Sequence, residues 1–130
     1  MPTLHLRVGP PIAAERLAVL AGRLTHLSTD ILGKRREVTA LVVEELWKGR
    51  WFIAGRPPQR ATAMLEIRIT AGTNTAEEKE DFVAAAFQEL QQQLGPLEEA
   101  SYVVVQELAA TDWGYGGMTQ ARRRHAAVPL

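Results

Sequence analysis

The chain has 130 residues, and its fifteen Lys and Arg residues balance its fifteen Asp and Glu residues. This balance gives no general attraction to nucleic acid or to an anionic membrane surface, and the lack of cysteine excludes disulfides, thiolate catalysis and cysteine-bound zinc. No apolar run reaches the roughly 20 residues that a membrane span needs. We therefore expect residues 1–130 to form a single cytoplasmic domain with no nucleic-acid or membrane partner.

The first half of the chain predicts a strand, a helix and a second strand. Apolar and polar residues alternate over Thr3–Val8, which is typical of a strand with one buried face. Leucine and isoleucine recur at three-and-four spacing between Pro11 and Leu32, which predicts a helix that stops at Gly33. β-Branched residues predict the next strand over Val38–Leu46, and the glycines and prolines of Trp47–Ala63 predict a connecting segment.

The second half predicts the same order of elements. Met64–Thr70 has the alternation and β-branched content of a strand. Thr75 and Glu78 have the spacing of a capping box, which opens a helix that ends at Gly95-Pro96. A last strand is predicted over Tyr102–Leu108.

Two copies of one unit account for this order. A Glu-Leu pair, a tryptophan and a glycine recur 62 positions apart, as Glu45-Leu46, Trp51 and Gly55 and then as Glu107-Leu108, Trp113 and Gly117. The repeats cover about residues 2–56 and 63–124. Two strands joined by a helix imply a parallel pair. Two such units therefore predict an α+β fold, with a four-stranded mixed sheet and both helices on one face.

The other face of this sheet has no predicted cover. Val42 and Val43 are apolar at consecutive positions, as are the three valines of 103–105, so both faces of these strands favour burial. We expect copies of the chain to cover this face by assembling into a closed ring, since a closed ring avoids open-ended assembly.

Pro2 is the first candidate for chemistry. It is a small residue directly after Met1, so we expect processing to remove the methionine and to leave Pro2 as a free secondary amine. Burial in an apolar pocket disfavours an ammonium, and a base poised near the working pH moves protons efficiently. The alternative is that Pro2 only begins an edge strand, where a missing N–H costs nothing.

The second copy carries a pattern that resembles a known family. A strand leads through a Glu-hydrophobic pair into an aromatic residue, a Gly-x-Gly-Gly turn and a basic tail, which are Val103–Leu108, Trp113, Gly114–Gly117 and Arg122–Arg124. Together with Pro2 and the repeat, this pattern is similar to the tautomerase superfamily, as a fused pair of 4-oxalocrotonate tautomerase units. The resemblance implies a cofactor-free isomerase that assembles as a homotrimer, in which the amine of Pro2 removes a proton beside a carbonyl and returns it elsewhere. The second copy has Ala63 or Met64 at the place of Pro2 and therefore no such amine.

The resemblance also implies substrate-binding residues. Gly33-Lys34 matches a Gly-Lys pair of the macrophage migration inhibitory factor group, whose lysine binds the substrate carboxylate. The pocket tyrosine of that group comes from a neighbouring subunit and falls on Tyr102. Trp113 falls on the aromatic wall of the pocket. These residues form the expected site around Pro2 as the catalytic residue. The alternatives are that Lys34 is simply a cation at a helix C-terminus, where it favours the dipole, that Tyr102 is a strand-start aromatic, and that Trp113 is a subunit contact.

Arg7 and Arg68 are further candidates for substrate binding, because they occupy equivalent strand positions. A guanidinium matches the geometry of a carboxylate, so this pair could clamp an acid. The alternative is a pair of ion pairs at a subunit interface, for example with Glu66. His5, His26 and His125 lack metal-ligand spacing, so we expect no metal site.

The expected substrate is a small 2-oxo acid or its enol. The arginines with which 4-oxalocrotonate tautomerase binds its substrate fall on Thr73, Ala40 and Tyr102, so phenylpyruvate-like enols are favoured over dicarboxylates. A hydratase, dehalogenase or decarboxylase of a three-carbon acid on the same fold is an alternative, and so is a non-catalytic oligomeric binding module. We expect the glycines of 114–117 to form a turn. We expect Arg122–Arg124 to form a solvated tail, although the resemblance to a tautomerase implies that this run could approach a neighbouring pocket.

Overall fold

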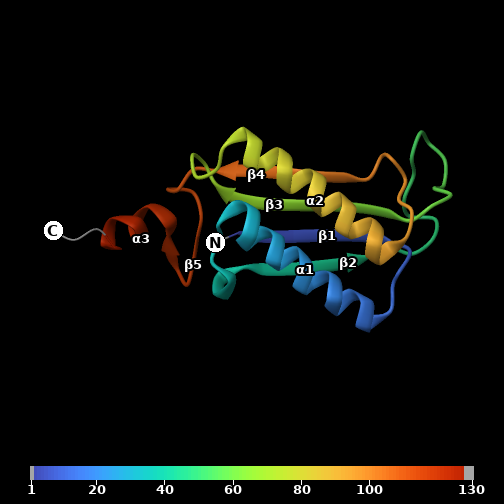
Figure 1. The fold of residues 1–130 in the computed structure, drawn as a ribbon, viewed down its shortest axis with the longest axis horizontal. Helices are drawn as coiled ribbons and strands as arrows, with labels where there is room; N and C mark the ends of the chain where they lie inside the picture. Colours follow the sequence, from blue (N-terminus) through green and yellow to red (C-terminus); the bar gives the residue numbers. More distant parts are fainter. Residues whose placement is uncertain (1, 128–130) are drawn as a thin grey trace.

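The computed structural model describes residues 2–127, and its main elements run as strand, helix and strand, twice over (Figure 1). The elements are β1 (Thr3–Gly9), α1 (Ala14–Leu32), the 3-10 helix η1 (Arg36–Val38), β2 (Ala40–Glu45), β3 (Thr62–Thr70), α2 (Ala76–Leu94), β4 (Tyr102–Leu108), β5 (Gly114–Tyr115), β6 (Met118–Thr119) and α3 (Gln120–Ala127). The helix α2 and the strand β4 each begin 62 positions after α1 and β2. The expected removal of Met1 concerns a residue outside those described.

The main sheet has the strand order β2-β1-β3-β4. β1 pairs in parallel with β2, and β3 with β4, while the two central strands β1 and β3 are antiparallel. Helices α1 and α2 lie side by side across one face of this sheet (Figure 1). The predicted α+β fold, with a mixed four-stranded sheet and two helices on one face, is confirmed. We propose that both repeats form one domain, because they share this sheet.

The core lies between the sheet and the two helices. Alternate residues of the central strands are buried there, as the strand period of two requires: Leu4, Leu6, Val8, Leu65, Ile67 and Ile69. The helices contribute Leu20 and Leu24 from α1 and Phe82 and Leu90 from α2. No helix within residues 2–127 is long and apolar enough to cross a membrane.

The opposite face of the sheet carries large apolar side chains without cover. Val42 of β2 is 60% exposed, and Tyr102 and Val104 of β4 are 56% and 43% exposed. A patch of this kind on a sheet face is typical of a surface that binds another protein. The open face, as we call it, also carries His5, Arg7, Glu44, Glu66 and Arg68.

Several boundaries differ from those that the sequence predicts. α1 begins at Ala14, three residues after Pro11, because its N-cap Ala13 has an extended backbone with φ −62° and ψ 144°. The N–H of Ile12, just before the cap, donates to a Glu45 carboxylate oxygen at 2.7 Å. β2 begins at Ala40 because residues 36–38 form η1, where the N–H of Thr39 donates to the Arg36 carbonyl at 3.1 Å.

The expected tail at Arg122–Arg124 is a helix, because these residues lie in α3, although Arg122 and Arg124 are exposed as expected. This helix is fixed to the segment that follows β4: the N–H of Gln120 donates to the Trp113 carbonyl at 2.9 Å, and the N–H of Ala121 donates to the Ala110 carbonyl at 2.8 Å. These bonds fix the start of α3 to the segment after β4, and the helix projects beyond the end of the sheet (Figure 1).

The glycine turn is confirmed as a hairpin. Gly116 and Gly117 connect β5 and β6 with φ of 62° and 80°, the left-handed conformation that two-residue hairpin turns require. The first repeat has a counterpart, since Ala54 and Gly55 have φ of 53° and 74° and lie inside an antiparallel bridge between Ile53 and Arg56. The duplication therefore extends beyond the strand-helix-strand unit.

The helix caps give a stability prediction. Thr75 Oγ1 accepts from the Glu78 N–H at 3.1 Å, whereas its counterpart Ala13 has no side-chain cap. Thr75→Ala should lower the free energy of unfolding by about 1 kcal/mol, because it leaves a helix donor unsatisfied. The matched change Ala13→Thr should raise it by a similar or smaller amount. Urea unfolding measures the free energy of unfolding of both variants. Effects of equal size and the same sign would contradict the assignment of Thr75 as a helix cap.

Candidate functional site

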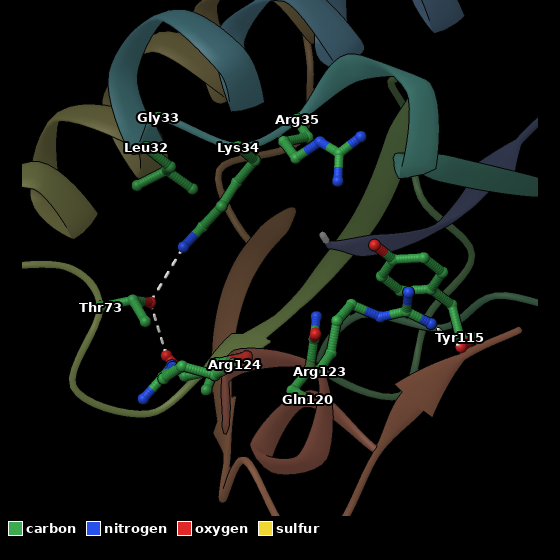
Figure 2. A pocket seen from close by; sticks show the side chains of 10 residues that line it. Leu32, Gly33, Lys34, Arg35, Thr73, Tyr115, Gln120, Arg123 and Arg124 are labelled. Atoms are coloured by element: carbon green, nitrogen blue, oxygen red, sulfur yellow. Dashed lines mark hydrogen bonds between the residues drawn. The ribbon is translucent and has the colours of Figure 1, made fainter. Parts of the chain in front are cut away.

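A cavity of about 400 Å³ opens at the end of the sheet where β1 begins and β3 ends. Its walls come from the end of α1, from the loop before η1, from the loop before α2, from the hairpin and from α3 (Figure 2). Four lining residues are cationic: Lys34, Arg35, Arg123 and Arg124. Among the described residues that line the cavity, none is acidic. The site therefore favours an anionic ligand.

Lys34 reaches the cavity because α1 ends in a left-handed turn. Gly33 has a φ of 68°, which few other residues adopt, and the N–H groups of Gly33 and Lys34 donate back to the carbonyls of Thr29 and Ser28. Lys34 Nζ then donates to Thr73 Oγ1 at 2.9 Å. No carboxylate of the described residues lies within 4.0 Å of this ammonium, so Lys34 can accept an external anion.

Burial lowers the pKa of Lys34 from the usual 10.5, while the charges of Glu78 and Glu107 act in the opposite direction. Glu107 is itself engaged, because its carboxylate accepts from Lys79 Nζ at 3.1 Å and from the Gly72 N–H at 3.3 Å. These bonds to Lys79 and Gly72 lower the pKa of Glu107 and keep it ionised. The negative charges of Glu78 and Glu107 thus favour the protonated form of Lys34, although neither carboxylate forms an ion pair with it.

Arg123 forms the facing wall. Its guanidinium lies 3.8 Å from the centre of the Tyr115 ring, and its Nη2 donates to the Tyr115 carbonyl at 2.7 Å. The sequence predicts Arg123 only as part of a basic tail that could approach a neighbouring pocket, and not as a residue of its own chain's site. The basic run directly after the Gly-Gly hairpin was the available signal, but only the fold brings it back to the cavity.

Pro2 lies at the same end of the sheet. Its side chain is fully buried, and its carbonyl accepts from the Ala40 N–H at 3.4 Å. Thr3 pairs with Arg68, so the preceding residue of the chain lies toward the end of β3, where Thr70 lines the cavity. Figure 2 shows the start of β1 reaching the cavity between Arg35 and Tyr115. Pro2 is not itself among the lining residues.

Trp113 lies behind the wall of the cavity. Its ring is half-buried, and its Nε1 donates to Thr70 Oγ1 at 3.2 Å. The counterpart Trp51 occupies the matching place in the first repeat, against Gly9, where a Cβ would come within 3.3 Å of the tryptophan ring. Both tryptophans therefore cover the end of a central strand.

Three other expected site residues lie away from the cavity within one chain. Arg7 and Arg68 are on the open face, where their Nε atoms lie 4.0 Å from Glu44 and 3.5 Å from Glu66 respectively. Tyr102 begins β4 and pairs with Met64, which places it at the opposite end of the sheet from the start of β1. A single chain thus brings Lys34 and Trp113, but not Tyr102, to the end of the sheet where Pro2 lies. Arg68 pairs with Thr3, next to Pro2, but lies with Arg7 on the open face and not in the cavity lining.

The other end of the sheet lacks the equivalent side chains. Ala63 occupies the place of Pro2, and Pro96 and Leu97 occupy those of Lys34 and Arg35. Ile53 stands in place of Tyr115. Among residues 2–127, the structure gathers no three His, Asp or Glu side chains that could hold a metal ion.

Comparison with known proteins gives one curated relative. No family model matches the chain. Probable tautomerase K2 of Dickeya dadantii (strain 3937) is 35% identical over 63 residues, which are 48% of this chain and 94% of that protein. The relative therefore has about the length of one repeat.

Solved structures with the same fold match nearly the whole chain. A native fused 4-OT is 26% identical, with a TM-score of 0.80 over 92% of this chain and 97% of that one. A fused 4-OT solved as an asymmetric trimer is 24% identical, with a TM-score of 0.85 over 93% and 98%. A protein inactivated by 2-oxo-3-pentynoate is 18% identical, with a TM-score of 0.85 over 93% and 98%.

The electrostatics of Lys34 can be tested directly. Its ammonium should titrate below 10.5, because burial disfavours the charged form. Glu107→Gln should lower this pKa further, since it removes a negative charge that stabilises the ammonium. NMR titration of the lysine side-chain carbon next to Nζ measures both values. An unchanged or higher pKa in Glu107→Gln would contradict the geometry.

Proposed function

The chain belongs to the tautomerase superfamily, and from that premise we propose that it is an isomerase that interconverts the keto and enol forms of a small 2-oxo acid. The main support for this proposal is the cationic cavity at the end of the sheet where β1 begins. A 2-oxo acid brings one carboxylate and, in the enolate, a second developing negative charge. The four cations of the cavity suit both charges.

Pro2 acts as the base once Met1 has been removed. A buried position disfavours a charged amine, so the neutral form is available. From an enol, the amine takes the hydroxyl proton, and the electrons of the O–H bond form the C=O bond while the C=C bond accepts a proton at carbon 3 from the resulting ammonium. The amine is regenerated, and the step consumes no cofactor.

Lys34 holds the carboxylate of the substrate in this scheme. Lys34 follows the C-terminal end of α1 and is half-buried. Its ammonium has no carboxylate partner among the described residues. Cations placed before the reaction stabilise the enolate, because they need no reorganisation as its charge develops. Trp113 lies behind the wall of the cavity and holds the Thr70 hydroxyl through its indole N–H.

The site is completed by assembly into a homotrimer. The open face carries exposed Val42, Val104 and Tyr102, which a neighbouring copy would cover. Tyr102 then reaches the cavity of that neighbour. Arg7 and Arg68, already paired with Glu44 and Glu66, serve the interface rather than the substrate. The cytoplasm, where small 2-oxo acids are abundant, is the proposed location.

The absence of an acidic residue from the described walls favours isomerisation over the alternative reactions. A hydratase or a hydrolytic dehalogenase needs an acid that activates water, and the cavity offers none of this kind. A non-catalytic binding module needs no free amine, so retention of Met1 would support that reading.

Pro2→Ala should reduce turnover of phenylenolpyruvate and 2-hydroxymuconate by roughly a hundredfold or more, because the poised secondary amine is lost. Pro57→Ala, at an exposed proline of the connecting segment, is the matched control and should behave as wild type. Stopped-flow absorbance of the enols measures the rates, and thermal unfolding checks the fold. Full activity in Pro2→Ala would refute the proline mechanism.

The pH profile should report Lys34. Only its protonated form binds a carboxylate, so kcat/KM should fall as the pH rises through the lowered pKa of Lys34. Lys34→Arg keeps its charge at all these pH values, so the alkaline fall should move upward. Lys34→Gln should raise KM by about tenfold with a smaller effect on kcat. An identical alkaline fall in Lys34→Arg would exclude this role.

A further inference from the structure

We propose that Arg123 is a second anion-binding residue of the cavity, which makes the site select small acids with two negative groups. This inference rests on the proposed function, because it names the substrate class of the same site. It also reverses the expectation from sequence that dicarboxylates are disfavoured, since Arg123 supplies a cation that the aligned positions lack.

Arg123 is held in place before any ligand arrives. Its guanidinium lies against the Tyr115 ring at 3.8 Å, and one of its terminal nitrogens donates to the Tyr115 carbonyl at 2.7 Å. Cation–π contact and a fixed hydrogen bond reduce the side-chain freedom that ligand binding would otherwise remove. The residue is therefore positioned as a binding group and not as a mobile surface cation.

The charge of Arg123 is not neutralised within the described chain. No carboxylate of these residues lies within 4.0 Å of its guanidinium. Its Nε is buried and has no hydrogen-bond partner among them. A half-buried cation without a counter-ion is unfavourable in an empty site, and an anion would relieve it.

Arg123 and Lys34 approach the cavity from opposite walls. Lys34 extends from the loop after α1, and Arg123 extends from α3 beside Tyr115 (Figure 2). The space of about 400 Å³ between the walls admits a short acid. A molecule with one carboxylate pairs one of these cations, whereas a molecule with a carboxylate at each end pairs both.

The other two cations of the cavity are less suited to this role. Arg35 is exposed, and its Nε lies 3.8 Å from the Glu37 carboxylate. Arg124 is exposed at the rim. Solvent screens such charges, so they contribute little to selection between ligands.

Binding of succinate and butyrate to the full chain tests the inference. The two acids have the same four-carbon length and differ by one carboxylate. Isothermal titration calorimetry should give a Kd for succinate at least about tenfold below that for butyrate, as a charge-assisted contact predicts. Arg123→Gln should raise the succinate Kd by about tenfold and leave the butyrate Kd within about twofold.

Arg122→Gln is the matched control. Arg122 is the preceding residue of α3, is exposed and does not line the cavity, so this variant should keep the wild-type preference. Retention of the preference in Arg123→Gln would overturn the inference, as would an equal loss in Arg122→Gln. Near-UV circular dichroism verifies that each variant is folded.

Chemical modification of the unaltered protein gives an independent test, should Arg123→Gln fail to fold. Phenylglyoxal reacts with arginine side chains, and peptide mass spectrometry locates the modified sites. Succinate should slow the modification of Arg123 more than butyrate does. The rate at which phenylglyoxal modifies Arg122 should be the same in the presence of either acid. Equal protection of Arg123 by the two acids would overturn the inference.

The outcome also separates this inference from the proposed function, because succinate undergoes no keto-enol reaction. If Pro2→Ala retained turnover, the proline mechanism would fail, although Arg123-dependent binding of succinate would stand. If turnover depended on Pro2 but succinate bound no better than butyrate, only the role of Arg123 would fail.

Discussion

The antiparallel pairing of the two central strands determines where chemistry can occur in this protein. Because β1 and β3 run in opposite directions, the start of β1 lies beside the end of β3, and the start of β3 lies beside the end of β1. Each end of the sheet therefore receives the start of one central strand, the end of one of the helices α1 and α2, and one hairpin. Pro2, Lys34 and Tyr115 meet at one end, whereas Ala63, Pro96 and Ile53 occupy the other. The cation-lined cavity lies at the first of these ends.

Local patterns in the sequence predict most of this architecture. The capping box at Thr75 and the strand at Tyr102–Leu108 appear where they are expected, because both depend on neighbouring residues. The helix α3 does not follow from the sequence, since Gln120–Ala127 has no apolar periodicity and is held by hydrogen bonds to distant residues. Arg123 could not be assigned for the same reason. Its contact with Tyr115 depends on how the hairpin turns.

Strand alternation also decides between the two roles that the sequence allows for Arg7 and Arg68, a clamp for the substrate carboxylate or ion pairs on the sheet face. Residues at alternate positions of β1 and β3 share the open face, so Arg7 and Arg68 must lie there. Which acids pair with them depends on the register, and the parallel pairing of β1 with β2 brings Glu44 opposite Arg7. In the cavity, by contrast, four cations lie together, and none of the described residues that line it is acidic. Such unneutralised charge weakens a fold and is typical of functional sites.

We infer that one amine per chain, at Pro2, faces a site for 2-oxo acids. Intact-mass analysis after treatment with 2-oxo-3-pentynoate, an electrophilic 2-oxo acid, tests this inference most directly. We expect a chain that begins at Pro2 and gains one molecule of reagent per chain, located on Pro2 by peptide mapping, with loss of any enol turnover. A chain that retains Met1, or a label on Lys34 with Pro2 unmodified, would contradict it.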